Sequence, residues 1–337
     1  MAARIGGRWP TKSPLALNDL QAYADAFAGI SPWAGEVPKG YMVDFLGTLT
    51  PGEFRVLFGV DPGTLGGRVE TRLPVINDGE GWFEAVDWVA AAHEARDSYV
   101  MVTLGACYGA QAVGSYRALQ LLNPMPYKLV AVEPEPENFA WMARYFRENG
   151  IDPDQHWLVQ AAMSDTNAPV FFPVGSPGIG VQNCFSTNEP GARKAYVREL
   201  VARGSPETAL ASLLLENTTG ITKSLKPGEN LMAEIKLLSA VTLRDISGPF
   251  DVVDYLESDI QQSEIVVFPP FLDLLRKKVR RIHIGTHGKD THWTLHNLFA
   301  ERGWEMVFSF EPNAEHDTPL GRFATNDGVL TVRNPDL

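Results

Sequence analysis

The sequence contains little cysteine and no long apolar run. Its two cysteines, Cys107 and Cys184, have no partner at a metal-ligand spacing, which argues against a metal site and a disulfide framework. No apolar stretch approaches the roughly 18 residues that a membrane span needs, and the N-terminal residues lack the apolar segment of a signal peptide. We therefore expect a cytoplasmic protein without a membrane partner and without a metal.

Positive charge is also scarce. The chain of 337 residues carries 29 Lys and Arg against 41 Asp and Glu, so its formal net charge is −12 at pH 7. Long-range electrostatics would repel nucleic acid and anionic membranes. The longest basic run, RKKVRR from Arg276 to Arg281, is typical of a helix end that continues into a strand. The composition therefore predicts no nucleic-acid partner.

Two parts of the chain differ in regularity. Residues 1–80 are rich in Gly and Pro, and we expect them to form an extension with one helix over 18–30, capped by Asn18. Residues 81–337 are expected to form one domain. An insertion at about 169–228, with Gly/Pro-rich turns and a predicted helix over 191–203, interrupts this domain and is a candidate lid.

Strand and helix patterns alternate regularly from Tyr99 onward. Short links between them predict an α/β fold, with a mostly parallel sheet and helices on both faces. Near the end, Asn326, Asp327 and Gly328 separate two strand-like runs, which predicts an antiparallel hairpin. The predicted strands are 99–104, 128–133, 156–163, 251–259, 280–287 and 304–310, and the predicted helices are 82–94, 110–122, 136–149, 270–278 and 291–302.

Gly105 and Gly109 flank the turn after the first of these strands. In open α/β sheets, ligands bind at the carboxyl ends of the strands, and glycine allows the backbone to approach them closely. The turn reads G-A-C-Y-G, so the dinucleotide pattern G-x-G-x-x-G is absent. We therefore favour a nucleoside site without a pyrophosphate cradle over the site of an NAD(P)-dependent oxidoreductase.

Polar residues also follow the next two strands. Glu133 ends the second strand in VAVEPEPENF, where a carboxylate can accept hydrogen bonds from both ribose hydroxyls. Its alternative role is an acid at a helix entry, favoured by the helix dipole. In QAAMSD, at the end of the third strand, polar groups could reach an adenine ring, or could form a local turn at Asp165.

These stretches resemble the motifs of a known family. MVTLGACYG, VAVEPEPENF, QAAMSD and YLESDIQQSE occur in the order of the motifs of FkbM-family S-adenosylmethionine-dependent methyltransferases, and the likeness extends from about Trp82 to the C-terminus. It implies a Rossmann-like class I methyltransferase fold, S-adenosylmethionine as cofactor, and O-methylation of a small molecule such as a sugar or secondary metabolite. The cofactor-binding residues that it implies are Thr103, Gly105, Ala106, Cys107, Tyr108, Gly109, Glu133, Pro134, Met163 and Ser164.

Two positions depart from the family pattern. Thr103 stands where the family has an acid that helps to hold the methionine amino group, and Gln262 stands where a glycine is expected. A degenerate, non-catalytic binding domain is therefore an alternative function.

Methyl transfer to a hydroxyl also needs a base, because the acceptor must lose its proton. Asp259, Glu264 and His287 lie at or just after predicted strand ends and are the candidates. Each has a structural alternative: a turn cap, an ion pair or a hydrogen-bonded histidine. Glu84, in the helix before the first strand, could reach the site from that helix, but we prefer to interpret it as part of a solvated helix face.

Overall fold

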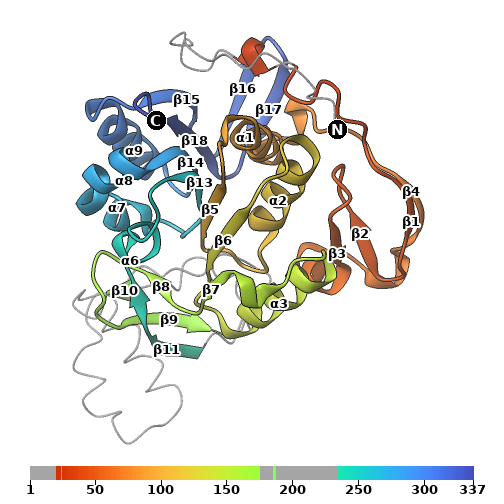
Figure 1. Cartoon of the computed structure of the whole chain (residues 1–337), viewed down its shortest axis with the longest axis horizontal. Coiled ribbons are helices and arrows are strands. Elements are labelled where there is room, and N and C mark those ends of the chain that lie inside the picture. The colour runs from red at the N-terminus through yellow and green to blue at the C-terminus, as the bar shows by residue number, and fades with distance from the viewer. Residues whose placement is uncertain (1–19, 24, 175–184, 187–233) are drawn as a thin grey trace, which may run out of the picture.

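Seven strands form the central sheet, in the order β15-β18-β14-β13-β5-β6-β7 (Figure 1). The computed structural model describes residues 20–23, 25–174, 185–186 and 234–337. β18 runs antiparallel to both its neighbours, whereas the other strands run parallel to one another. The strands are β5 (Tyr99–Leu104), β6 (Tyr127–Val132), β7 (Trp157–Val159), β13 (Val253–Ser258), β14 (Val279–Thr286), β15 (Glu305–Phe310) and β18 (Gly328–Arg333).

Helices cover both faces of this sheet. Tyr99 and Met101 of β5 pack into a core with α1, α2 and α3, whereas Val100, Val102 and Leu104 pack into a second core with α6 to α9. Burial on both sides explains why the run YVMVTL is almost entirely apolar. The helices are α1 (Glu80–Glu94), α2 (Ala110–Leu122), α3 (Pro136–Glu148), α6 (Leu243–Ser247), α7 (Glu264–Val267), α8 (Leu272–Lys278) and α9 (Lys289–Glu301).

The α/β fold with a mostly parallel sheet is thus confirmed, but two strand predictions need correction. The predicted strand 156–163 is two strands, because only β7 joins the central sheet and β8 (Ala162–Met163) pairs with β12 (Ala240–Val241). At the C-terminus, β17 (Gly321–Thr325) pairs with β16 (Ala314–Thr318). The turn at Asn326 then leads into β18, which lies between β14 and β15, so β17 and β18 do not form the expected hairpin.

The described part of the predicted N-terminal extension consists of short elements, of which β1 to β4 lie at the right of Figure 1. β1 pairs with β4 and β2 with β3, and Phe45 and Phe54 join the core of α1 to α3. The described residues of the expected helix over 18–30 form a short 3-10 helix and turns instead. The elements are η1 (Leu20–Tyr23), β1 (Ala34–Val37), β2 (Tyr41–Val43), β3 (Leu49–Pro51), η2 (Gly52–Phe58), η3 (Pro62–Thr64), β4 (Gly67–Glu70) and η4 (Ile76–Asp78).

A small antiparallel sheet lies in and next to the predicted insertion. It is formed by β9 (Val170–Val174), β10 (Phe185–Ser186) and β11 (Glu234–Leu238). The predicted helix over 191–203 lies outside the described residues. The remaining short elements are η5 (Pro153–Gln155) and η7 (Pro269–Phe271).

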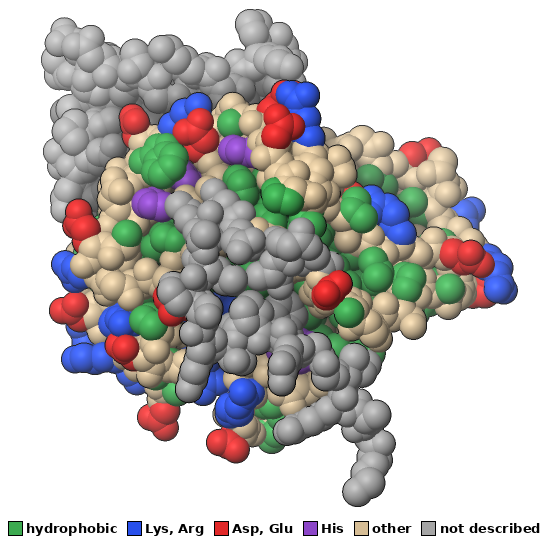
Figure 2. Space-filling view, turned by 90° about the horizontal axis from the view of Figure 1, so that it is seen from above, with side chains coloured by type: hydrophobic (Ala, Val, Ile, Leu, Met, Phe, Trp, Pro, Cys, Tyr) green, Lys and Arg blue, Asp and Glu red, His purple; other side chains and the backbone are tan. Residues whose placement is uncertain are grey.

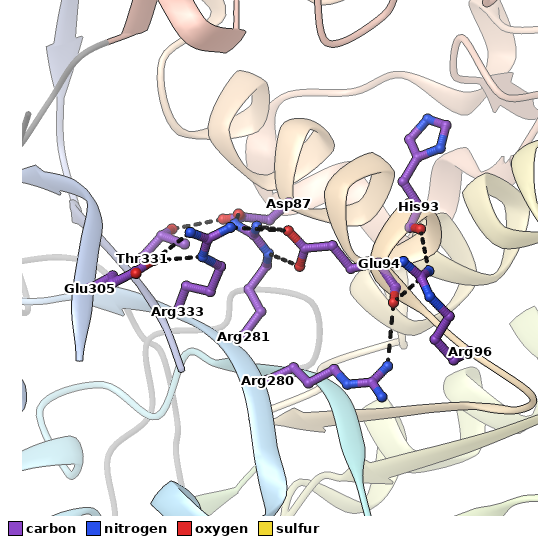
Figure 3. A network of polar contacts seen from close by, with 9 residues as sticks. All are labelled: Asp87, His93, Glu94, Arg96, Arg280, Arg281, Glu305, Thr331 and Arg333. Carbon is purple, nitrogen blue, oxygen red and sulfur yellow. Dashed lines mark hydrogen bonds and ion pairs between the residues drawn. The ribbon is translucent and has the colours of Figure 1, made fainter. Parts of the chain in front are cut away.

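A buried polar network fixes α1 to the sheet (Figure 3). The Arg281 guanidinium on β14, 1% exposed, lies 2.9 Å from Asp87 and 2.8 Å from Glu94, both on α1. The second Asp87 oxygen lies 2.8 Å from His283 Nδ1 and accepts the Thr331 hydroxyl at 2.7 Å. Asp87 is therefore fully paired, as a buried charge must be, and the start of α1 is held beside the carboxyl ends of β13 and β14.

Candidate functional site

A cleft opens at the carboxyl ends of β5, β6 and β13. It encloses about 550 Å³ of open space. Six of the residues implied by the sequence line it: Gly105, Cys107, Glu133, Pro134, Met163 and Asp259. The cleft lies where the chain reverses its direction of strand addition, with β6 on one side of β5 and β13 on the other, which is the ligand position expected in open α/β sheets.

The turn after β5 brings main chain to the wall of the cleft. Gly105 has φ +77°, and a Cβ atom there would lie 2.0 Å from the Asp259 carbonyl oxygen. No larger residue fits this close approach. Gly109, φ +92°, caps α2, and Cys107 between them takes φ +50°, a conformation uncommon for non-glycine residues.

The other residues of this turn lie behind the cleft. Ala106 and Tyr108 are buried, and the Tyr108 ring packs 5.3 Å from the rings of Phe54 and Tyr145. Neither side chain lines the cleft. Burial raises the pKa of the Cys107 thiol to about 12, so this group is a poor nucleophile at neutral pH.

Glu133 is held in a fixed orientation at the end of β6. Its Oε2 accepts the Cys107 N–H at 2.7 Å, and its Oε1 accepts the Glu135 N–H at 2.8 Å. Burial raises the pKa of Glu133 to about 8, although these hydrogen bonds oppose the shift. A carboxylate has about four lone-pair sites, so both oxygens retain acceptor capacity. Glu135 caps α3, as expected for an acid at a helix entry.

The third strand end contributes through apolar side chains. Met163 and Phe172 line the cleft. Ser164 is buried, donates its hydroxyl to Asp165 at 3.2 Å and lies outside the lining. Phe172 was missed at the sequence level because no motif marks it, whereas Asn138 and Gln261 lie within VAVEPEPENF and YLESDIQQSE but were not singled out.

Thr103 is fully buried, and its partner lies on the neighbouring strand. Its hydroxyl donates to Glu257 Oε2 at 2.5 Å, and the two residues are directly paired between β5 and β13. They are 154 residues apart, so no local pattern could reveal this contact.

The three candidate bases lie close together but in different environments. The Asp259 side chain is 46% exposed and lines the cleft, and its Oδ1 lies 3.1 Å from His287 Nε2. Glu264 is fully buried and accepts the Ile260 N–H. Although burial opposes it, the carboxylates of Asp259 and Glu264, 3.1 and 3.7 Å from the ring nitrogens, raise the pKa of His287 to about 10. His287 is therefore charged at neutral pH and holds Asp259 in place.

The segment after Asp259 has an unusual backbone. Gln261 and Gln262 take φ +55° and +76° in succession. Gln261 Nε2 donates to Asp259 Oδ1 at 2.7 Å, and Gln262 Nε2 donates to the His287 carbonyl oxygen at 3.2 Å. Left-handed non-glycine residues cluster at functional sites, and Gln262 occupies the position where the resemblance expects glycine.

Two acids on α1 also face this region. Burial, followed by the charges of Glu84, Asp259 and Asp327, raises the pKa of Glu80 to about 9. Burial raises the pKa of Glu84 to about 7, with Asp259 adding to the shift. Glu84 is half-buried, so its interpretation as part of a solvated helix face was wrong. Glu84 precedes the buried Asp87 by three residues, and residues at this spacing lie on the same face of a helix. This spacing was the sequence signal for the burial of Glu84.

His283, His287 and His292 do not converge on one point. His283 contacts Asp87, whereas His292 lies 3.0 Å from both Thr286 Oγ1 and Ser309 Oγ. Within the described residues, no group of three or more His, Cys, Asp or Glu is arranged to hold a metal ion.

The strand order decides the fold family. From β7 inward to β14 five parallel strands follow, and the antiparallel β18 then lies between β14 and β15. This is the class I methyltransferase fold. The cleft at the ends of its central strands is where such a Rossmann-like sheet binds a nucleoside ligand.

This chain resembles a known protein in sequence, although it matches no family model. The chain is 23% identical over 257 residues to a "Putative methyltransferase" of Jannaschia sp. (strain CCS1), which covers 75% of this chain and 80% of that protein. The fold and this relative together support a methyltransferase, whereas membership of the FkbM family is not confirmed.

Similar solved structures are distant. One is the methyltransferase FkbM from Methylobacillus flagellatus, with 12% identity and a TM-score of 0.38; the match covers 71% of this chain and 45% of that one. Another is the O-methyltransferase TomG from Streptomyces achromogenes in complex with SAM, with 11% identity, a TM-score of 0.38 and coverage of 84% and 86%. A third is a "putative RNA methyltransferase" from Pyrococcus horikoshii, with 9% identity, a TM-score of 0.33 and coverage of 78% and 91%.

The expected absence of a nucleic-acid partner stays a prediction. On the face shown in Figure 2, Lys and Arg side chains are interspersed with Asp and Glu and form no continuous basic surface. None of the described helices is both long and apolar enough for a membrane span.

Proposed function

We propose that this protein is an S-adenosylmethionine-dependent methyltransferase that methylates an oxygen of a small molecule. The observation that carries the proposal is Glu133, fixed by the N–H groups of Cys107 and Glu135 at the wall of the cleft. A carboxylate in this position can accept both ribose hydroxyls of a nucleoside.

The residues of the cleft fit this cofactor. The cleft combines apolar side chains with a small number of polar groups, as small-molecule sites do. Gly105 lets main chain approach the ligand, and Met163 and Phe172 offer apolar surface to an adenine ring. The cofactor would supply a methyl group already activated on a sulfonium, so the protein must align the acceptor and exclude water.

Asp259 is the base that the geometry supports best. It lines the cleft, and the charged His287 lies 3.1 Å from its Oδ1 and orients it. Glu264 is enclosed and His287 already carries its proton, so we assign these two residues to positioning Asp259. A neutral hydroxyl is the acceptor that needs such a base, since an oxygen must lose its proton as it gains the methyl group.

Isothermal titration calorimetry with S-adenosylmethionine tests the cofactor site. We expect binding to the natural chain and affinity about 10- to 100-fold weaker in Glu133→Gln, because the amide keeps only one of the two oxygens that accept hydrogen bonds. Glu137→Gln is the matched control. Glu137 is exposed near the start of α3, four residues after Glu133, and this variant should bind S-adenosylmethionine with unchanged affinity. Absence of binding to the folded natural chain, or equal affinities in all three proteins, would refute the assignment.

Mass spectrometry of reaction products tests the acceptor class. Incubation with S-adenosylmethionine and separate pools of hydroxylated small molecules, amines and RNA should add 14 mass units only in the first pool (replacement of H by CH₃, from elementary composition). A product in the RNA pool would overturn the small-molecule proposal. Cofactor binding without a product in any pool, in both the natural chain and Asp259→Asn, would favour the non-catalytic alternative.

A further inference from the structure

Glu257 is a buried carboxyl group that accepts a hydrogen bond but forms no ion pair with any residue that the structure describes. Its side chain accepts the Thr103 hydroxyl at 2.5 Å. The charged groups that act most strongly on it are the carboxylates of Asp259, Glu84 and Glu80. Burial and these neighbours raise the pKa of Glu257 well above its ordinary value. Burial therefore favours the neutral form of Glu257, and its ionised form is stable there only when a positive charge pairs with it.

Other buried carboxylates of the protein do have cationic partners. Asp87 pairs with Arg281, and Asp254, on the same strand as Glu257, pairs with Arg280 at 2.7 Å. These pairs lie toward the amino ends of the strands, away from the cleft. Glu257, near the carboxyl end of β13, has no such ion pair among the described residues.

The position of Glu257 relates it to the cleft. Glu257 on β13 is paired in register with Thr103 on β5. Two residues further along these strands come Asp259 and Gly105, respectively, and both line the cleft. Residues two apart on a strand point to the same face and are separated by about 7 Å. A glutamate side chain can span much of this distance. Glu257 thus lies one step below the cleft, on the face covered by α1.

We propose that Glu257 binds the ammonium group of the cofactor's amino-acid portion and so replaces the carboxylate that Thr103 lacks. The inference rests on the proposed S-adenosylmethionine site. The Thr103 hydroxyl holds Glu257 Oε2 and leaves Oε1 to receive the ammonium. The acid is thereby moved from β5 to the paired position on β13, and the buried carboxyl gains its cation when the cofactor binds.

Two ligands separate this role from a general effect on the site. S-adenosylhomocysteine carries the amino-acid portion, whereas methylthioadenosine has the same nucleoside and thioether without it. We expect Glu257→Gln to weaken S-adenosylhomocysteine binding about 10- to 100-fold, as loss of a charged hydrogen bond does. Methylthioadenosine should bind within about twofold of the natural affinity, which also shows that the variant is folded.

The remaining outcomes decide between the proposals. Three outcomes would overturn only the role of Glu257 and leave the proposed function standing. They are unchanged S-adenosylhomocysteine binding in Glu257→Gln, equal losses for both ligands in that variant, or a larger selective loss in the matched variant Glu84→Gln. A natural chain that binds neither ligand would overturn the proposed function, and the role of Glu257 with it. If Glu257→Gln does not fold, Thr103→Val should give the same selective loss at about 3- to 10-fold, and equal affinities in that variant would refute the inference.

Discussion

Gly105→Ala tests the close approach between the turn after β5 and the end of β13. The added Cβ atom would lie 2.0 Å from the Asp259 carbonyl oxygen and 2.9 Å from its carbon. Left-handed backbone costs a non-glycine residue about 1–2 kcal/mol, and overpacking typically costs about 1–3 kcal/mol. We expect the free energy of unfolding to fall by about 2–5 kcal/mol, measured by urea denaturation.

Gly150→Ala separates these two costs. Gly150 has the same φ of +77°, but no atom lies within 4 Å of its added Cβ. Its replacement should cost only the left-handed backbone, about 1–2 kcal/mol. Relief of the clash in Gly105→Ala would displace Asp259, so S-adenosylmethionine binding should be lost there and kept in Gly150→Ala. Equal destabilisation of the two variants, with cofactor binding intact in both, would refute the reasoning.

Three further predictions follow from the site and its supports. The pKa of His287 is raised from 6.5 to about 10, so its stabilisation is complete below pH 6.5 and is lost as the pH rises toward 10, by roughly 1.4 kcal/mol per pKa unit. Melting temperatures measured across this range should decline in the natural chain but not in His287→Gln. His93→Gln is the control and should decline like the natural chain, because the pKa of His93 is lowered. A decline in all three proteins would contradict the role of His287. Arg281→Met leaves buried Asp87 without its cation and should lower the free energy of unfolding by about 3–5 kcal/mol, measured by urea denaturation. The control Arg322→Met breaks an exposed pair with Glu315 and should lower it by at most about 1 kcal/mol. Similar losses in the two variants would argue against the buried network. Gln262→Gly relieves a φ of +76° and should raise the free energy of unfolding by about 0.5–1 kcal/mol, the left-handed cost less the entropy of glycine, and a destabilised variant would count against backbone strain at this position.

Much of the fold could be predicted from the sequence because its signals are local. The run YVMVTL, the Gly105 turn and the following helix agree with β5 and α2 at every boundary. Pro136 in the first turn and Gly150 beyond the end bounded α3 within one residue. Periodicity and caps are properties of neighbouring residues, and these segments contain them in full.

Strand pairing could not be predicted in the same way. HWLVQAAM is a single apolar run, yet β8 leaves the central sheet because β12, nearly 80 residues later in sequence, provides its partner. The Asn326 turn predicted a hairpin, but β18 is placed by β14 and β15 on either side. In each case the choice depends on residues outside the segment.

In the candidate site, too, local features could be predicted from the sequence and contacts between distant segments could not. The sequence by itself determined where glycines permit close backbone approach and where an acid ends β6, because both are fixed by the order of residues within one β-α unit. Only the tertiary structure decided that Thr103 pairs with Glu257, that Glu84 faces the site, and that His287 is charged beside Asp259. Those properties arise from burial and from contacts between distant segments, and a side chain acquires them only when the sheet has assembled.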